Sequence, residues 1–234
     1  MARIRNAIIM AAGRGLRMMP LTATVPKAMA PFLDSTLIAN VIRRIRKHVD
    51  VIHVTVGYKG PLLAEHVISL GADCVYNTSG KGNSWWIYNT MLMRLDEPLL
   101  VLTCDNVVEL DLEQLEREYM RQNNPTCMLV PVKPVPGMEG DYIFRKDDLV
   151  MRLDRNTQSD MYCSGIQVLN PAMINRLTLP VEDFYSVWEQ LITQRQVYCS
   201  RIIPKRWFSV DTVDQLSSIN ESESALSSIP RRGL

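Results

Sequence analysis

Short apolar runs alternate along the chain with segments whose apolar residues recur every three or four positions. The runs, which are bounded by polar residues or glycine, predict buried strands at 7–12, 51–56, 73–76, 98–103, 126–132, 162–169 and 197–203. The helical periodicity predicts helices at 36–47, 61–69, 85–95, 171–177, 184–194 and 213–219. Strands that alternate with helices are typical of an open α/β sheet, where ligands collect beyond the carboxyl ends of the strands.

Three segments add to this alternation. Residues 141–145 and 149–153 predict a hairpin that turns at 146–148. Asp111 is placed to cap a helix that begins at the next residue. Residues 220–234 are rich in serine and glutamate and poor in apolar side chains, so we expect a mobile tail there. The sequence therefore predicts one domain over residues 1–219.

Composition and charge narrow the class of protein. At 234 residues, with 47% hydrophobic and 22% charged residues, the chain can bury one sizeable core. A formal net charge of +1, with no basic run longer than two residues, argues against a nucleic-acid partner. No segment approaches the roughly 18 apolar residues of a membrane span. The five cysteines form no C-x-x-C pair, which predicts buried thiols in a reducing cytoplasm.

Small residues and fixed positive charge follow the first predicted strand. Residues with little or no side chain let a ligand lie close to backbone N–H groups, and the chain has four of them here: Ala11, Ala12, Gly13 and Gly15. Three cations lie nearby in the sequence: Arg14, Arg17 and Lys27. Together they predict a site for the phosphates of a nucleoside triphosphate.

Two familiar phosphate-binding motifs do not fit this loop. A dinucleotide-binding fingerprint needs a third glycine at position 18, where this chain has Met18. A P-loop needs Gly-Lys-Ser/Thr, but Gly15 is followed by Leu16 and Arg17. The loop therefore belongs to neither class.

The segment 11–31 reads A-A-G-x-G-x-R-x-x-P-L-T-x-x-x-P-K-x-M-x-P. This pattern resembles the signature of the sugar-1-phosphate nucleotidyltransferases, and the choline-phosphate cytidylyltransferases share the same opening. The resemblance spans residues 6–219. It implies a Rossmann-like fold, with a mixed, mostly parallel central sheet flanked by helices, of the nucleotide-diphospho-sugar transferase type. It also implies a cytoplasmic enzyme of NDP-sugar and cell-surface polysaccharide biosynthesis, in which Arg17 and Lys27 are catalytic.

Two aspartates are candidate metal ligands. Asp105 follows the predicted strand 98–103, and a carboxylate buried there needs a cation or several donors beside it. The resemblance places a metal-binding aspartate at this point, and Mg²⁺, which binds one or two carboxylates together with substrate phosphates, suits it. Asp211 is the second candidate. It directly precedes Thr212, as in the choline-phosphate branch, whereas sugar-directed members have the aspartate where this chain has Ser209.

The remaining candidates concern the base and the acceptor. The polar turn 77–83 is either an ordinary turn or a base-reading loop, and the resemblance favours Asn77, Gly82 and Asn83 as nucleotide-binding residues. An acceptor side is expected within about 133–200. The residues that we assign to it are Tyr142, Ser164, Gly165 and Trp188. Trp188 also belongs to the apolar stripe of a helix, and a stripe of that kind is usually core.

The function that follows from the resemblance is transfer of NMP from an NTP to a phosphorylated small molecule, with release of pyrophosphate. A sugar 1-phosphate is the first choice of acceptor. Phosphocholine is an alternative, because the aromatic residues Trp85, Trp86, Trp188, Tyr142 and Tyr162 suffice to build a cage for a quaternary ammonium. A non-catalytic nucleotide-binding regulatory domain is a further alternative. The base, the acceptor and the oligomeric state, including a homo-oligomer, stay open.

Overall fold

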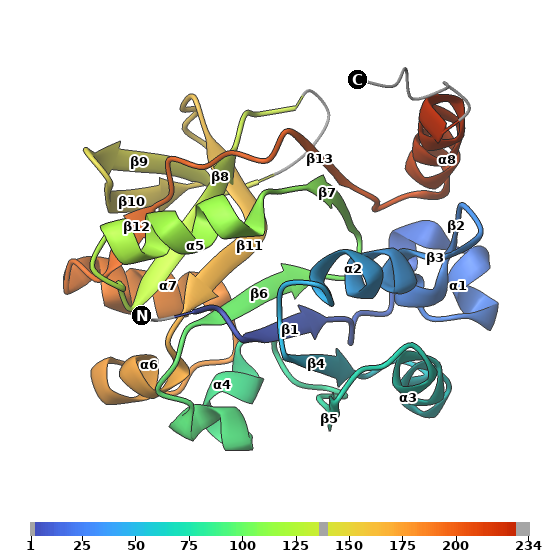
Figure 1. The fold of residues 1–234 in the computed structure, drawn as a ribbon, viewed down its shortest axis with the longest axis horizontal. Coiled ribbons are helices and arrows are strands. Elements are labelled where there is room, and N and C mark those ends of the chain that lie inside the picture. The colour runs from blue at the N-terminus through green and yellow to red at the C-terminus, as the bar shows by residue number, and fades with distance from the viewer. Residues whose placement is uncertain (1–2, 136–139, 228–234) are drawn as a thin grey trace.

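The structure is a computed structural model that describes residues 3–135 and 140–227. Within these residues, nine strands form one central sheet (Figure 1). Their spatial order is β5 (Cys74–Asn77), β4 (Val51–Val56), β1 (Asn6–Met10), β6 (Leu99–Thr103), β11 (Tyr162–Leu169), β8 (Cys127–Val132), β12 (Val197–Cys199), β10 (Leu149–Asp154) and β9 (Tyr142–Lys146). β11 and β10 run in the opposite direction to the other strands. The predicted mixed, mostly parallel sheet is confirmed.

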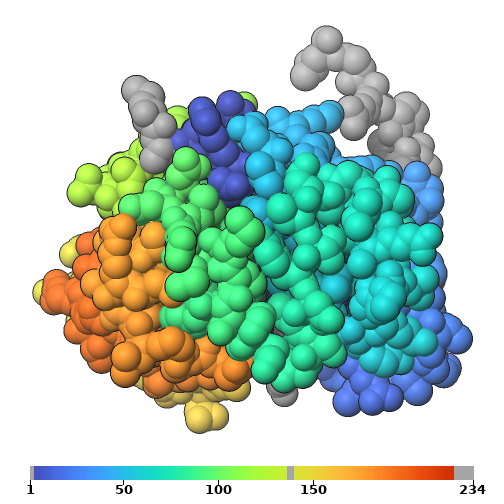
Figure 2. Space-filling view, turned by 90° about the horizontal axis from the view of Figure 1, so that it is seen from below, coloured from blue at the N-terminus to red at the C-terminus, as the bar shows by residue number. Residues whose placement is uncertain are grey.

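Helices cover both faces of the sheet, because successive side chains of a strand point to opposite faces. In β1, Ala7 and Ile9 pack in one apolar cluster and Ile8 packs in the other. The first cluster includes residues of α2 (Leu37–Ile45), α3 (Gly60–Ser69) and α5 (Leu112–Arg121). The second includes residues of α4 (Trp85–Asn89), α6 (Pro171–Leu177) and α7 (Phe184–Thr193). Seen from below, α6, α4 and α3 lie in a row (Figure 2). The chain is a single α/β domain.

Short elements connect the strand ends to the rest of the chain. They are η1 (Leu16–Met18), α1 (Leu21–Thr24), η2 (Lys27–Met29), the hairpin of β2 (Pro31–Phe32) and β3 (Ser35–Thr36), and the ribbon of β7 (Asn106–Glu109) and β13 (Arg206–Ser209). α8 (Val213–Ser227) closes the described chain. A third apolar cluster joins these parts, with Met18 and Phe32 packed together with Leu216 and Ile219 of α8.

The short connecting elements were not predicted from the sequence, and three of the predicted elements differ clearly in the structure. The helix predicted at 85–95 is split, because the Thr90 hydroxyl accepts a hydrogen bond from the Leu92 N–H and starts a new turn, η3 (Met91–Arg94). The strand predicted at 197–203 ends at Cys199. The Ser200 hydroxyl then accepts a hydrogen bond from the Ile202 N–H. The last helix continues past residue 219 to Ser227, and residues 228–234 lie outside the described part of the chain.

The free energy of unfolding is expected to decrease as the pH falls, because His53 is buried. The imidazole is 6% exposed in β4, and burial lowers its pKa from 6.5, although Asp73 opposes the shift. As the pH falls, the unfolded chain therefore takes up the proton before the folded protein does, and stability is lost below the pKa of the unfolded state. Each pH unit of full linkage is worth at most about 1.4 kcal/mol.

Urea unfolding at about pH 7.5 and about pH 5.5 tests this expectation. His53→Gln should reduce the loss of unfolding free energy between the two pH values, because glutamine does not titrate. An equal loss in the wild type and the variant would show that His53 is not the titrating group.

Candidate active site

The loop after β1 lies at the carboxyl ends of the parallel strands. The Ala11 N–H donates to the Thr55 hydroxyl at 3.1 Å, and the Ala12 carbonyl accepts from the Tyr58 N–H at 3.1 Å. These two bonds hold the loop against β4 and the residues that follow it. Gly13 and Arg14 are exposed, and a Cβ added at Gly13 would meet no atom within 4 Å. The predicted nucleotide loop is therefore anchored at its base and open at its tip.

Lys27 reaches into the same region from η2. Its side chain passes close to Gly15, where an added Cβ would lie 2.8 Å from the Lys27 Cβ. Lys27 is 9% exposed, and its Nζ donates to Asp105 and, at 2.8 Å, to Asp211 Oδ1. Burial alone would lower the pKa of Lys27, but Asp105 and Asp211 outweigh it and raise the pKa above the usual 10.5. The lysine is thus held in its charged form.

The β7–β13 ribbon brings the two aspartates together, although 105 and 211 are far apart in the sequence. Asn106 of β7 is paired with Ser209 of β13, so the residue before one strand lies next to the residues that follow the other. The Val210 N–H also donates to the Asp105 carbonyl at 3.0 Å. Antiparallel pairing thereby places both carboxylates at one end of the ribbon, beside Lys27.

Arg17 completes this cluster of charges. Its guanidinium lies 3.0 Å from Asp211 Oδ1 and is two-thirds exposed, whereas Lys27 is buried. The structure thus brings together four residues that the sequence singled out: Arg17, Lys27, Asp105 and Asp211. Two cations and two carboxylates share one site at the carboxyl ends of β1 and β6.

The carboxylate pair fits a divalent cation of the magnesium type. Both aspartates already converge on a single positive atom, Lys27 Nζ, so they bound one cation-sized space. Among the residues that the structure describes, no group of three or more His, Cys, Asp or Glu forms a closed metal cage. Two carboxylates suit Mg²⁺, which fills its other positions with water and substrate phosphates, better than they suit structural zinc.

Of the predicted base-reading residues, Asn77 ends β5, and Gly82 and Asn83 lie in the loop that follows, which is tied to the start of α7. Asn77 Oδ1 accepts from the Ser79 N–H at 3.0 Å, and Asn83 Oδ1 accepts from the Phe184 N–H at 2.9 Å. The Gly82 N–H donates to Glu182 at 2.7 Å. The side-chain oxygens of both asparagines therefore stabilise the loop, and contact of this loop with a base stays a prediction.

Ser164 and Gly165 lie beside the β7–β13 ribbon. The Ser164 carbonyl accepts from Asn106 Nδ2 at 2.8 Å and from Trp207 Nε1 at 3.0 Å. Gly165 has a φ of 81°, which a side chain would strain. Asn106 and Trp207 were not predicted as site residues. Their proximity in the sequence to Asp105 and Asp211 could have indicated them.

An aromatic series continues from this point. Trp207 packs edge-on against Tyr162 with ring centroids 5.7 Å apart, and Tyr162 packs edge-on against Tyr142 at 5.9 Å. Tyr162 is buried, whereas Tyr142 and Trp207 are partly exposed. The predicted acceptor residues Tyr142, Ser164 and Gly165 thus share one region with Trp207.

Trp188 lies elsewhere, in the core. It is 8% exposed, its indole N–H donates to Gln167 at 2.9 Å, and its ring stacks on Phe184 at 5.7 Å. Trp86 is also core, at 1% exposed. The helical stripe of α7 buries Trp188 against the sheet, so the structure does not bring it to the acceptor region.

Comparison with known proteins identifies the family. The family model described as nucleotidyl transferase matches residues 6–222. The chain belongs to this family. A relative, the catalytic subunit beta of mannose-1-phosphate guanylyltransferase from Drosophila melanogaster, is 20% identical over 209 residues, covering 82% of this chain. The match spans 56% of the length of that relative.

Solved structures share the fold of this nucleotidyl transferase family member. A UDP-glucose pyrophosphorylase complexed with UDP-glucose superposes with a TM-score of 0.77 at 15% identity, covering 95% of this chain and 99% of the other. The CTP:phosphocholine cytidylyltransferase of Streptococcus pneumoniae superposes with a TM-score of 0.73 at 18% identity, covering 94% and 99%. Identities this low show a common fold.

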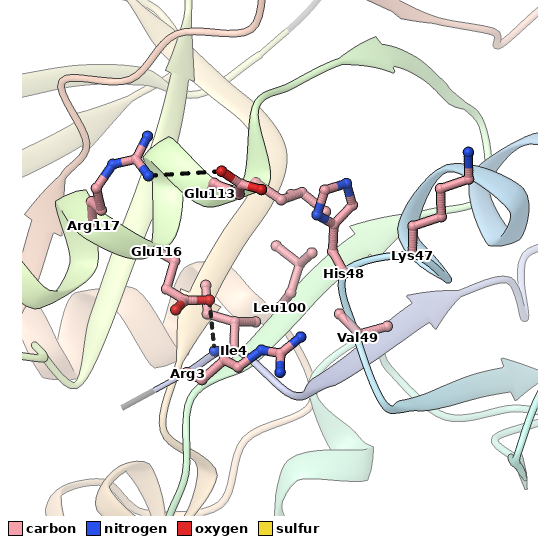
Figure 3. Close-up of a pocket in the computed structure, with 10 residues that line it drawn as sticks. Arg3, Ile4, Lys47, His48, Val49, Leu100, Glu113, Glu116 and Arg117 are labelled. Carbon is pink, nitrogen blue, oxygen red and sulfur yellow. Dashed lines mark hydrogen bonds and ion pairs between the residues drawn. The ribbon is translucent and has the colours of Figure 1, made fainter. Parts of the chain in front are cut away.

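A separate hollow lies at the other end of the strands (Figure 3). Ile4, just before β1, and Leu100 of β6 line it, together with the first turn of α5. Glu116 accepts from the Ile4 N–H at 3.3 Å, and Arg117 lies 3.8 Å from Glu113. Because Lys27 and the aspartates lie beyond the carboxyl ends of β1 and β6, this hollow does not belong to the candidate active site.

Gly15→Ala is expected to destabilise the protein more than Gly80→Ala does. Both glycines have φ near 70°, so alanine strains the backbone similarly at both positions. An added Cβ meets nothing within 4 Å at Gly80, but at Gly15 it collides with the Lys27 side chain. We expect an extra loss of about 1–3 kcal/mol of unfolding free energy for Gly15→Ala, measured by urea unfolding. Equal losses would mean that Lys27 moves aside freely.

Proposed function

We propose that this chain transfers a nucleoside monophosphate from a nucleoside triphosphate to a phosphorylated small molecule and releases pyrophosphate. The observation that carries the proposal is the charge cluster at the open glycine loop, with Lys27 Nζ between Asp105 and Asp211 and Arg17 alongside. A sugar 1-phosphate is the proposed acceptor, because the relatives are named as enzymes of mannose 1-phosphate and UDP-glucose.

The main physical obstacle to this reaction is repulsion between two phosphorylated molecules. Like charges about 4 Å apart repel by about 4 kcal/mol at an effective dielectric constant of roughly 20. Lys27 and Arg17 supply fixed positive charge close to the loop that would hold the triphosphate. In the structure, Asp105 and Asp211 balance these charges, so arriving phosphates would compete with the carboxylates for the two cations.

The acceptor phosphate would attack the α-phosphorus in line, and the bond to the pyrophosphate leaving group would break. A phosphate oxygen is already ionised near neutral pH, so the attack needs no general base. Mg²⁺ held by Asp105 and Asp211 would neutralise phosphate charge and polarise the phosphoryl group. The protein's own contribution is to orient the two phosphates and to stabilise the charge that develops between them.

Phosphocholine is a second candidate acceptor, favoured by one specific observation. Tyr142, Tyr162 and Trp207 form a continuous aromatic series next to Ser164. Aromatic faces attract quaternary ammonium groups. Asp211 directly precedes Thr212, which is the spacing of the choline-phosphate branch. The S. pneumoniae cytidylyltransferase also shares the fold.

A cytoplasmic location is part of the proposal, as is a product that enters cell-surface polysaccharide synthesis. Free thiols at all five cysteines support a reducing compartment. Among the described residues, no helix combines the length and the apolar character needed to cross a bilayer.

A pyrophosphate-release assay tests the function. The purified chain is incubated with Mg²⁺ and each of CTP, UTP, GTP and dTTP, crossed with a panel of sugar 1-phosphates and phosphocholine. We expect release with one combination of base and acceptor, and no release when either substrate is omitted. Nucleotide binding without release for any pair would instead support a regulatory, non-catalytic domain.

A further inference from the structure

A side chain in the first turn of α8 accepts a hydrogen bond from the backbone N–H of Asp211. Gln215 Oε1 accepts from the Asp211 N–H at 2.7 Å and from the Thr212 N–H at 3.0 Å. In return, the Thr212 hydroxyl accepts from the Gln215 N–H at 3.2 Å. This reciprocal pair is a capping box, in which a side chain three residues into the helix satisfies the N–H of the cap residue. Here the same oxygen also reaches one residue further back, to Asp211.

That extra bond fixes the backbone of a residue whose carboxylate lies in the charge cluster. Asp211 Oδ1 is bound by Lys27 and Arg17, and the Ser209 hydroxyl lies 3.4 Å from Oδ2. The position of the carboxylate depends on the backbone from which it projects. Gln215 hydrogen-bonds the backbone of Asp211 and Thr212, so it acts on the site through Asp211.

α8 is itself attached to the signature segment. Five residues after Gln215, Asn220 accepts from the Leu33 N–H at 2.7 Å and donates to the Pro31 carbonyl at 3.2 Å. Leu216 and Ile219 pack with Met18 and Phe32 in the same apolar cluster. Because the helix is fixed to the segment that carries Arg17 and Lys27, the Gln215 oxygen has a defined place relative to the cations.

We infer that Gln215 is a positioning residue that sets the Asp211 carboxylate for metal and phosphate chemistry. The inference rests on the proposed function for its catalytic consequence, but the geometry of the carboxylate pair can be measured without catalysis. A displacement of about 1 Å in a reacting group can cost on the order of 100-fold in rate, so one backbone bond is sufficient to matter.

α5 offers a matched control for the loss of a helix cap. Gln114 is three residues after the cap residue Asp111, and its N–H and its side-chain amide both donate to that carboxylate. The first turn of α5 lines the hollow at the amino ends of β1 and β6, at the opposite end of the strands from Asp211. Gln114→Met therefore weakens a cap without touching the charge cluster.

The test compares Gln215→Met, Gln215→Glu and Gln114→Met with the wild type. Metal binding is measured with Mn²⁺ alone, by electron paramagnetic resonance of the free ion. The values of kcat and KM are measured by pyrophosphate release. Methionine keeps the length of the side chain without the oxygen acceptor. We expect Gln215→Met to weaken Mn²⁺ binding about tenfold and to lower kcat about 30- to 100-fold, with KM changing much less. Gln215→Glu should recover most of both losses, since glutamate can accept the same bonds.

Gln114→Met loses its side-chain bond to Asp111 and should leave Mn²⁺ affinity and kcat unchanged. If Gln215→Met matches this control in Mn²⁺ affinity and kcat, Gln215 is only a cap and the inference is overturned. If Gln215→Met does not fold, Gln215→Ala is measured in the same way. Should the wild type release no pyrophosphate with any substrate pair, the proposed function fails, whereas a Mn²⁺ loss rescued by Gln215→Glu still supports the positioning role.

Discussion

Replacing Lys27 by methionine is expected to lower the rate of nucleotidyl transfer by about three orders of magnitude. In the proposed reaction the buried charge of Lys27 would offset repulsion between the phosphates, and removal of one such group from a preorganised site costs roughly 100- to 1,000-fold. Methionine keeps most of the volume beside Gly15 but removes the charge. The measurement is kcat for pyrophosphate release under saturating Mg²⁺ and substrates.

The same substitution should strengthen binding of Mn²⁺ to the free protein. In the wild type, Lys27 Nζ is bound to oxygens of Asp105 and Asp211 that the proposed metal ion would also need. Without the lysine, the two carboxylates repel each other and gain more from a divalent cation. We therefore expect Lys27→Met to be destabilised in the absence of metal and to recover stability when Mn²⁺ is added.

Lys205→Met serves as the control, because Lys205 is exposed and lies 4.0 Å from Glu109, outside the cluster. It should leave both transfer and Mn²⁺ affinity unchanged. Lys27 would lose its central role if Lys27→Met retained the turnover of this control. Unchanged Mn²⁺ affinity in Lys27→Met would show that the lysine and the metal do not share a place.

Asp105→Asn and Asp211→Asn are each expected to lower transfer by about 1,000-fold or more. Asparagine preserves the shape of the side chain but removes the negative charge that would hold a divalent cation next to Lys27. Removal of metal with EDTA should abolish activity in the wild type, and added Mg²⁺ should restore it. Mn²⁺ titration of the two variants should show weakened binding in both.

Asp214→Asn is the matched control for these aspartates. Asp214 lies in the first turn of α8, three residues after Asp211, and is exposed. The substitution removes the same charge from the same element without changing the carboxylate pair. Normal metal affinity and normal nucleotide binding in Asp105→Asn or Asp211→Asn would refute the metal assignment for that residue.

Local patterns were sufficient to predict most of the fold. The strands are short apolar runs, and the cap at Asp111 follows from residue type, so each could be predicted without tertiary information. The signature segment also marked Arg17 and Lys27, which the structure places together with the two aspartates.

Features that depend on distant residues could not be predicted in this way. The contact between Asn83 and the start of α7 spans 101 residues, and no local pattern indicates it. The continuation of α8 depends on partners such as Arg206, which lies 2.6 Å from Glu223, so its polar sequence alone suggested a tail. Helical periodicity placed Trp188 on the apolar face of its helix, but it did not show whether that face packs in the core or lines a pocket.

The β7–β13 ribbon also has a consequence for how the protein matures during synthesis. The central sheet has all of its strands once Cys199 has emerged from the ribosome, but Asp211 and α8 emerge later. A nascent chain can therefore complete its sheet while the carboxylate pair is still missing. The charge cluster is completed last, when β13 pairs with β7 and brings Asp211 to Lys27.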